Sequence, residues 1–280
     1  MGSHASGDPA GARGSDPLVG AVQPPDLSIM TFNVLRARAA SAPWRRRRDR
    51  IRALLQRERP TLLGAQEVLP HQAALLRSAL GGDYRLLGHG RDAGGTGEGC
   101  PLLYDATRLA LVEGEQGALS RTPDVPGSLS WGSLFPRVFV RAVFLDRVTG
   151  ERFTVVNTHL DVLSPLARRR AAEAIVARVG DGAVIVTGDF NAGPASPPRR
   201  ILEGAGLDDS WAIARARVSP EWSTHVLGGR PRAGGNRIDA IHTRGFDVAR
   251  AGIEGRPTLG GWPSDHLPVQ AVVRQRAVAA

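Results

Sequence analysis

The feature of this sequence that most constrains its fold is a series of short apolar runs, each followed by a compact polar motif. Four of these runs have the length and β-branched content of buried strands: Leu27–Met30, Leu62–Ala65, Phe153–Val156 and Ala183–Val186. The polar motifs are Thr31–Asn33, Gln66–Glu67, Asn157–Asp161, Gly188–Asn191, Arg237–Asp239 and Ser264–His266. Because polar groups at the ends of buried strands are held on a rigid scaffold at the mouth of a sheet, these motifs predict one composite site.

The expected secondary structure is rich in strands. We predict strands at Leu27–Asn33, Thr61–Gln66, Tyr84–Leu87, Pro101–Tyr104, Leu109–Glu113, Arg137–Asp146, Arg152–His159, Ala183–Gly188, Arg237–His242, Asp247–Ala249 and Pro268–Val273. We predict helices at Arg46–Arg57, His71–Leu80, Pro165–Val179 and Pro198–Gly204. The helices separate groups of strands and do not alternate strictly with them. This order favours an α+β domain in which two packed sheets are covered by helices.

The N-terminal segment has a different composition from the rest of the chain. Residues 1–25 are mostly Gly, Ala, Ser, Pro and Asp, so we expect them to be disordered and residues 26–280 to form one domain. The segment lacks the apolar stretch of a signal peptide, and no run approaches the length of a membrane span. The single cysteine, Cys100, excludes an intrachain disulfide. We therefore expect a cytoplasmic protein, or a secreted one if a leader has been removed ahead of Met1.

The charge of the chain favours an anionic partner. The formal net charge is +9, and arginine supplies it without any lysine. The planar guanidinium matches phosphate oxygens, although many arginines in such a chain will simply be solvated. The runs Arg45–Arg48, Arg168–Arg170 and Arg199–Arg200 are candidates for contacts with a nucleic-acid backbone. Only Trp44 lies close to such a run, so support for stacking on bases is weak.

Two of the motifs offer oxygen ligands for a metal ion. Asn33 and Glu67 each close an early strand, and their amide and carboxylate oxygens suit Mg²⁺ or Mn²⁺. The alternative for Asn33 is a turn residue, a role that asparagine often takes at the end of a strand.

The motif Gly188–Asn191 is the most informative one. Asp189 and Asn191 follow a buried strand and share its alternation, so both side chains are expected on the same side. A carboxylate beside an amide suits a base that activates water and a group that holds that water or a phosphate. The alternative is an Asx turn.

Two histidines become stronger candidates for the site if each has a carboxylate partner. For His159 the candidate partner is Glu98, which lies between two glycines that allow a close approach of the backbone. For His266 the natural partner is Asp239. Other chemistries are disfavoured, since the chain has no phosphate-binding loop with lysine, no His-Glu-x-x-His motif and no pair of cysteines.

Taken together, the six motifs resemble those of the endonuclease/exonuclease/phosphatase superfamily, also called the deoxyribonuclease I-like fold. The resemblance runs from about Leu27 to Val273 in the order of the family, and Gly188–Asn191 and Ser264–His266 are its most specific parts. It implies a four-layer α/β/β/α sandwich with two packed mixed β-sheets, and a Mg²⁺-dependent hydrolysis of a phosphoester for which Mn²⁺ is a possible substitute. The motif Asn157–His159 departs from that of apurinic endonucleases and looks more like an uncharacterised bacterial branch.

The resemblance also implies roles for individual residues. Glu67 looks like the principal metal ligand, with Asn33 beside it and Asp265 holding the ion or its waters. Asp189 resembles the base and Asn191 the group that orients water and phosphate. His266, held by Asp239, is expected to stabilise charge in the transition state. His159, with Glu98 in support, is expected to contact the phosphate or protonate the leaving oxygen. Arg137 and Asn157 are expected to bind substrate.

The sequence therefore predicts a metal-dependent phosphodiesterase or phosphatase. One alternative is a nuclease that acts on DNA or RNA. A second is a phosphate-binding module of the same fold without catalysis, which is disfavoured because every catalytic motif is intact. The identity of the substrate and the oligomeric state are not encoded in any readable motif.

Overall fold

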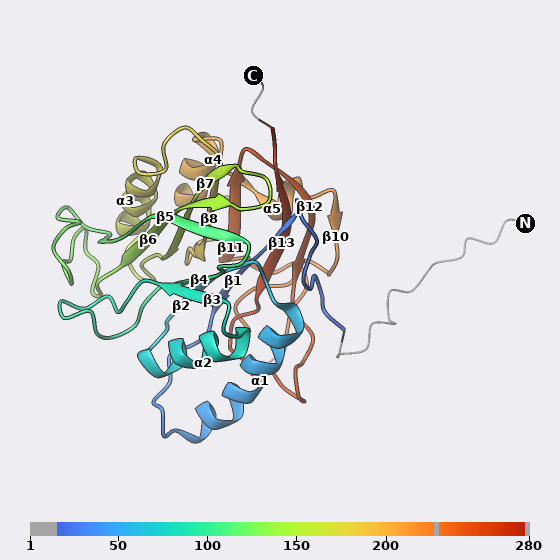
Figure 1. Ribbon diagram of the computed structural model, residues 1–280. Helices are drawn as coiled ribbons and strands as arrows, with labels where there is room; N and C mark the ends of the chain where they lie inside the picture. The colour runs from blue at the N-terminus through green and yellow to red at the C-terminus, as the bar shows by residue number, and fades with distance from the viewer. Residues whose placement is uncertain (1–15, 227–229, 278–280) are drawn as a thin grey trace, which may run out of the picture.

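The computed structural model describes residues 16–226 and 230–277. Two β-sheets form the centre of the molecule. The seven-stranded sheet has the order β10-β12-β13-β1-β2-β4-β3, and the six-stranded sheet has the order β5-β6-β7-β8-β11-β9. Both are mixed, because β1 pairs with β2 and β7 pairs with β8 in parallel while most other pairs are antiparallel. The sheets and the helices that flank them confirm the predicted fold class (Figure 1).

The bounds of the elements are as follows. The strands of the seven-stranded sheet are β1 (Leu27–Asn33), β2 (Leu62–Gln66), β3 (Tyr84–Leu87), β4 (Leu102–Asp105), β10 (Ala216–Arg217), β12 (Phe246–Ile253) and β13 (Val269–Gln275). Those of the six-stranded sheet are β5 (Leu109–Ala118), β6 (Val138–Asp146), β7 (Arg152–His159), β8 (Val184–Asp189), β9 (Asp208–Asp209) and β11 (Asp239–Arg244). The helices are α1 (Ala42–Glu58), α2 (Pro70–Leu80), α3 (Pro165–Val176), α4 (Pro197–Gly204) and α5 (Ser210–Ile213).

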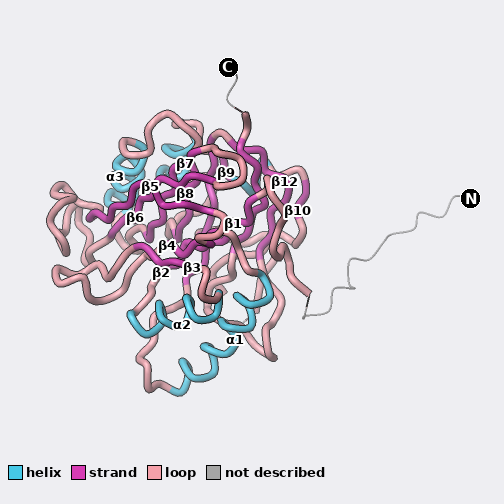
Figure 2. Tube along the Cα trace, viewed as in Figure 1, coloured by secondary structure: helices cyan, strands magenta, loops and turns pink. Residues whose placement is uncertain are grey.

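Alternating side chains along the strands divide the core into layers. Leu27 and Ile29 of β1 pack between the sheets with residues such as Ile185 of β8, whereas Met30 and Phe32 face α1 and α2. On the other sheet, α3 and α4 pack against the outer face of β7 and β8. Figure 2 shows the strands stacked in the middle and the two groups of helices on opposite sides. This arrangement is the predicted four-layer sandwich, and it follows from the period-two pattern of strands that are buried on both faces.

Part of the N-terminal segment is tied to the domain. Residues 1–15 lie outside the described residues. The backbone amides of Leu18, Val19 and Gly20 donate to the buried carboxylate of Glu58 at 3.0–3.2 Å. The predicted disorder therefore does not extend to these three residues, because a buried anion at the end of α1 accepts their N–H groups.

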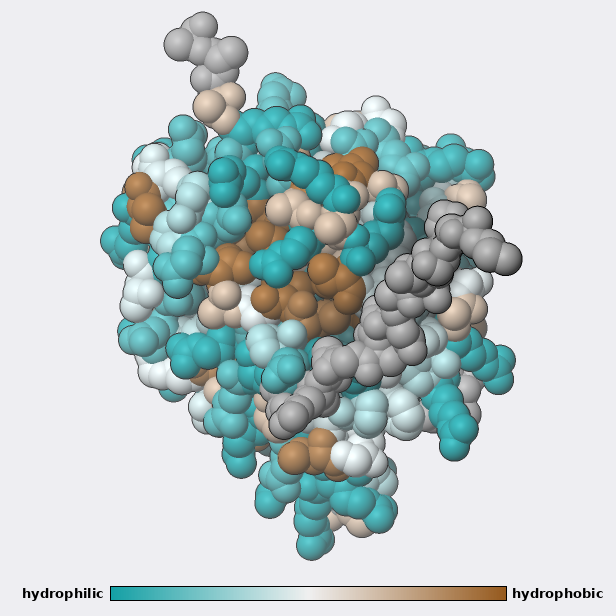
Figure 3. Space-filling view, turned by 90° about the vertical axis from the view of Figure 1, so that its right-hand side faces the viewer, coloured by the Kyte–Doolittle hydropathy of each residue, from teal (hydrophilic) through white to brown (hydrophobic). Residues whose placement is uncertain are grey.

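One edge of the seven-stranded sheet is covered by apolar side chains. Figure 3 looks onto the side that carries β10 and β12 and shows apolar residues gathered in the middle of a largely hydrophilic face. At this edge Leu18 and Val218 pack over Gly252 of β12, where an added Cβ would lie 2.9 and 2.8 Å from their methyl groups. Among the residues that the structure describes, no helix combines the length and the apolar character needed to cross a membrane.

Candidate active site

The strand pairing brings the polar motifs to one end of the two sheets. In the parallel pair β1–β2, Asn33 lies opposite Gln66, immediately before Glu67. In the six-stranded sheet, Asp189 lies opposite His159 on one side and Asp239 on the other. Because parallel strands end at the same edge, motifs far apart in sequence become neighbours.

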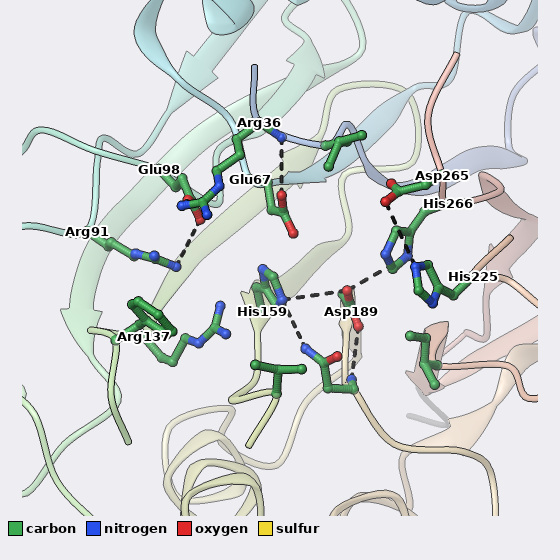
Figure 4. Close-up of a pocket in the computed structure, with 15 residues that line it drawn as sticks. Arg36, Glu67, Arg91, Glu98, Arg137, His159, Asp189, His225, Asp265 and His266 are labelled. Atoms are coloured by element: carbon green, nitrogen blue, oxygen red, sulfur yellow. Dashed lines mark hydrogen bonds and ion pairs between the residues drawn. The ribbon is translucent and has the colours of Figure 1, made fainter. Parts of the chain in front are cut away.

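The motifs surround a pocket of about 340 Å³, which we call the main pocket (Figure 4). Its lining includes eight of the predicted site residues: Glu67, Glu98, Arg137, His159, Asp189, Asn191, Asp265 and His266. The other three predicted residues do not line it: Asn33, Asn157 and Asp239. The predicted convergence is thus present for most of the residues that the resemblance assigned to catalysis and metal binding. Asn33 and Asp239 are the exceptions, because they do not line the pocket.

Asp189 is the centre of the contacts. Its Oδ1 accepts the N–H of Asn191 at 2.9 Å, and its Oδ2 accepts from the Asn33 amide at 3.0 Å. The same Oδ2 lies 3.6 Å from His159 Nε2 and 3.8 Å from His266 Nδ1. Burial, together with the charge of Asp239, raises the pKa of Asp189 to about 7. A carboxyl group with these surroundings can exchange a proton near neutral pH.

The turn after β8 sets the position of Asn191. Its backbone adopts φ 48°, in the left-handed region, and its N–H closes an Asx turn on Asp189. Asn191 therefore reaches the main pocket through this turn, whereas we predicted that strand alternation would place it beside Asp189, the last residue of β8. The Asx turn, which the sequence offered as the alternative, is present, and Asn191 lines the main pocket with it.

Asn33 holds Glu67 in place. The Asn33 Nδ2 donates to Glu67 Oε1 at 3.1 Å, while its Oδ1 accepts the N–H of Leu35 at 3.0 Å. Glu67 Oε2 accepts the N–H of Arg36 at 3.1 Å, and Glu67 itself has a left-handed φ of 58°. In this arrangement Asn33 turns its nitrogen toward the carboxylates, so it acts as a donor that orients Glu67 and does not present an oxygen to an ion.

His266 has the carboxylate partner that was predicted. Its Nδ1 donates to Asp239 Oδ2 at 2.8 Å, and its backbone N–H donates to Ser264 Oγ at 3.2 Å. Burial alone would lower the pKa of His266. The charge and hydrogen bond of Asp239, with the charge of Asp189, outweigh burial and raise it to about 10. His266 is therefore a cation in the main pocket.

His159 differs from the prediction in its partner. Its Nε2 accepts from Asn191 Nδ2 at 3.0 Å, and the second N–H of that amide goes to the Leu160 carbonyl. Glu98 does not hold it, because the Glu98 carboxylate is taken by Arg36 and, at 3.0 Å, by Arg91. Burial, with the charges of Arg137 and His266, lowers the pKa of His159 well below its usual value. His159 is therefore neutral here.

Arg137 faces the main pocket and Asn157 does not. Arg137 immediately precedes β6, and its Nε lies 3.7 Å from Asp161 Oδ2 without a hydrogen-bond partner among the described residues. Asn157 is completely buried between the sheets, where its amide donates to the carbonyls of Ala65, Cys100 and Pro101. The prediction that Asn157 contacts substrate is wrong in this structure, because its side chain is used to join the two sheets.

Three polar residues that we did not single out from the sequence also line the main pocket: Arg36, Arg91 and His225. Arg91 lies in the glycine-rich segment 88–99, which is long for a simple connection between strands. His225 stacks on His266 with ring centroids 4.7 Å apart, and its Nε2 lies 3.9 Å from Asp265 Oδ2 (Figure 4). None of the three directly follows the last residue of a strand, so the rule that located Glu67 and Asp189 could not find them.

The chemistry of the donors fits a hard divalent cation. Glu67 and Asp265 line the main pocket with Asp189, and both are only partly buried. Carboxylate oxygens are the ligands that Mg²⁺ and Mn²⁺ prefer. Arg36 and Arg91 are paired with Glu98. Glu67 and Asp265 would therefore be the carboxylate ligands of such a cation.

Comparisons with known proteins agree with this geometry. The sequence model described as Endonuclease/Exonuclease/phosphatase family matches residues 30–266. No curated protein was found to match the chain. The structure of an endonuclease/exonuclease/phosphatase from Bacteroides vulgatus superposes with a TM-score of 0.83 and 28% sequence identity, covering 90% of this chain and 99% of that one.

Two further solved structures share the fold. A mannosyl-6-phosphatase of Bacteroides thetaiotaomicron has a TM-score of 0.79 and 27% identity, with 88% of this chain and 99% of that chain covered. TDP2 of D. rerio, complexed with a single-strand DNA product, has a TM-score of 0.65 and 16% identity, with 89% and 99% covered. The second likeness concerns the fold alone.

Proposed function

Since the chain belongs to the endonuclease/exonuclease/phosphatase family, we propose that it hydrolyses a small phosphoester in the main pocket with the help of Mg²⁺. Members of this family are hydrolases that act on phosphoesters. The observation that carries the proposal is the convergence of Glu67, Asp189 and His266 from three distant parts of the chain on one pocket. Such a set combines a carboxylate for a metal ion, a base and a cation, which together suit attack of water on phosphorus.

Each residue is assigned a role that its contacts support. Glu67 and Asp265 would hold the divalent cation, which supplies positive charge that offsets the charge on the phosphate oxygens. Asp189 takes a proton from the attacking water, whose oxygen bonds to phosphorus as the bond to the leaving oxygen breaks, and the leaving oxygen takes up a proton from solvent water. Asn191, anchored to His159 and Leu160 by its nitrogen, leaves its amide oxygen to orient that water.

The cationic side of the pocket receives the phosphate. His266 is kept charged and oriented by Asp239, so it donates to phosphate oxygens as their charge grows. Arg137 lines the same pocket and adds the positive charge of its guanidinium there. His159 is neutral and accepts from Asn191, so we assign it to positioning that amide instead of protonating the leaving group.

Two observations favour a small substrate over a nucleic acid. Two of the nine arginines predicted to bind a nucleic-acid backbone are engaged inside the protein: Arg47 bonds to the carbonyls of Val34 and Leu35, and Arg199 is completely buried against Asp209. In addition, a mannosyl-6-phosphatase is among the similar structures at 27% identity. A sugar phosphate is therefore the first substrate class to test, with a nuclease as the alternative outcome.

A substrate panel tests the proposal. Mannose 6-phosphate, 4-nitrophenyl phosphate, bis(4-nitrophenyl) phosphate, RNA and plasmid DNA would each be incubated with Mg²⁺, Mn²⁺ or a chelator. We expect hydrolysis of the small esters with either ion and none with chelator. Asp189→Asn should lower the rate at least a hundredfold, the size expected for a lost acid–base group. Asp247→Asn, an exposed carboxylate on β12, is the matched control.

The outcomes separate the alternatives. Cleavage of DNA or RNA with little action on small esters would support the nuclease. Activity that persists in chelator, or in Asp189→Asn, would contradict the proposed mechanism.

A further inference from the structure

A second hollow, which we call the side pocket, adjoins the main pocket. Its volume is about 650 Å³, and the two pockets share Arg36, Arg91, Glu98 and Phe135 in their linings. Arg38 and Asp92 line the side pocket but not the main pocket. A group bound at the shared residues would therefore touch both spaces, and a substrate longer than its phosphate can extend from one into the other.

Glu98 is fixed at the boundary between the pockets. The backbones of Gly99 and Val68 exchange N–H···O bonds of 2.8 and 3.0 Å, which ties this segment to the residue after Glu67. A Cβ at Gly99 would lie 2.6 Å from the carbonyl oxygen of His89, so the hairpin closes only with glycine there. Glu98 is 8% exposed, and its position relative to Glu67 is set by the backbone.

The boundary carries two guanidinium groups on one carboxylate. Arg36 and Arg91 both pair with Glu98, from opposite sides as Figure 4 shows. Arg91 also lies over the ring of Phe135, with its Cζ 5.5 Å from the ring centroid. Two cations held by a single anion leave one positive charge uncompensated, in a position that Glu98 and Phe135 restrict.

Arg38 adds a further positive charge. Its guanidinium makes no hydrogen bond or ion pair with any residue that the structure describes, although it lines the side pocket. The one other acidic residue in that lining, Asp92, folds back over Gly97, where an added Cβ would lie 2.1 Å from its Oδ2. The side pocket is therefore net cationic, whereas Glu67, Asp189 and Asp265 give the main pocket its anionic groups.

We propose that the side pocket binds the leaving part of the substrate and selects a leaving group that carries a second anionic group, a carboxylate or a phosphate. The anion is bound by Arg38 together with the Arg36–Glu98–Arg91 cluster, and Phe135 covers the carbon chain between the two anions. This inference rests on the proposed function for the position of the first phosphate. It adds that the leaving group must carry a second anionic group.

The test compares ligands that differ only at the far end. Sorbitol 6-phosphate and 6-phosphogluconate share a six-carbon chain and one phosphate, but the second ends in a carboxylate. Fructose 6-phosphate and fructose 1,6-bisphosphate form the corresponding pair for a second phosphate. Binding is measured by isothermal titration calorimetry with Mg²⁺ in Asp189→Asn, which limits turnover of the ligands.

We expect the ligand with two anionic groups to bind about tenfold more tightly in at least one pair, the size of one charge-assisted hydrogen bond. Arg38→Gln should remove most of that difference. Arg85→Gln is the matched control, because Arg85 is an exposed arginine on β3 that contacts only nearby carbonyl groups. Thermal melting of each variant confirms that it is folded.

The outcomes separate this inference from the proposed function. Equal affinities within both pairs, or a difference that survives Arg38→Gln, would overturn the anion subsite even if the unmutated protein hydrolyses 4-nitrophenyl phosphate. Failure to hydrolyse any small ester would instead contradict the proposed function. A preference for two anions that depends on Arg38 supports the subsite in either case, because calorimetry reads binding alone.

Discussion

At the scale of single residues, the site is built from side chains that restrain one another. Asp189 contacts Asn33 and Asn191 directly and lies near both His159 and His266. Left-handed backbone at Glu67 and Asn191 adds local strain of the kind that persists where surrounding contacts fix it. The chemistry therefore depends as much on supporting contacts as on the groups that would touch the substrate.

Asp239 offers a direct test of such support. It lies behind His266 and does not line the main pocket, so Asp239→Asn keeps the shape while removing the charge that holds the imidazolium. We expect kcat to fall about tenfold to a hundredfold, as for other residues that orient a functional histidine, with little change in KM. Steady-state kinetics with and without the change measure this, and Asp247→Asn again serves as the control. An unchanged kcat would remove the positioning role.

Asn157 is predicted to act on stability and not on substrate. Its side chain joins Gln66, Thr187 and three backbone carbonyls at distances of 2.8–3.1 Å. Asn157→Ala leaves several of these buried groups without partners, so the free energy of unfolding should drop by about 2–4 kcal/mol. Urea unfolding measures the loss. A raised KM at unchanged stability would restore Asn157 to substrate binding.

The sequence placed residues correctly in the main pocket where a polar motif follows the end of a strand, as Glu67 and Asp189 do. His266 precedes β13, and its predicted partnership with Asp239 is present in the structure. Glu98 was assigned to His159 because both had been singled out. The arginines that actually bind Glu98 come from two separate loops, and no local pattern marks which arginine of so many will reach a given carboxylate.

At the scale of elements, the site depends on how closely the sheets approach one another. Gly64 of β2 faces β7 and β8 across the interface, and a Cβ there would lie 2.2 Å from Thr187 Oγ1 and 2.6 Å from Asn157 Oδ1. The absence of a side chain at this position lets the two sheets bring Glu67 and Asp189 to one pocket.

Gly64→Ala tests that close approach. The added methyl group has no space, so we expect a loss of about 1–3 kcal/mol in the free energy of unfolding from overpacking. Activity per folded molecule should fall as well, because the ends of β2 and β8 move apart. Gly204→Ala at the end of α4 is the control, since nothing lies within 4 Å of its Cβ position. Equal stability of the two variants would show that the interface tolerates the methyl group.

Elements with a strong pattern of their own were predicted to within a few residues. β1, β3 and β7 have the predicted bounds, whereas α3 ends at Val176 and not at Val179. β5 runs on to Ala118, beyond the predicted Glu113, because its polar and exposed second half is held by pairing with β6. The two-residue strands β9 and β10 and the short α5 were missed, since so few residues carry no periodicity.

At the scale of the whole molecule, stability is tied to buried ionisable groups on the far side of the six-stranded sheet. His242 of β11 is completely buried, and its Nδ1 donates to the Leu207 carbonyl at 2.8 Å. Burial, with the charge of Arg199, lowers the pKa of His242 to about 3. The imidazole is therefore neutral in the folded protein and takes up a proton much more readily when the chain unfolds.

This difference predicts a loss of stability in acid. Because the folded pKa lies below the unfolded value near 6.5, the contribution is complete above that pH and is lost as the pH falls toward 3. Each proton taken up on unfolding makes the free energy of unfolding fall more steeply with decreasing pH, by about 1.4 kcal/mol per pH unit. His242→Gln, which keeps a donor, should reduce the slope of unfolding free energy between pH 6 and pH 4 by about this amount. Identical slopes in urea titrations of the two proteins would rule out His242 as a source.

The burial of the single cysteine follows from the same layered architecture. Cys100 lies between the sheets, where its carbonyl accepts from Asn157, and burial raises the pKa of its thiol to about 12. A thiol that is both covered and protonated reacts slowly with alkylating reagents. Maleimide labelling would therefore report when the two halves of the sandwich separate, which makes the native chain its own probe of opening without any engineered label.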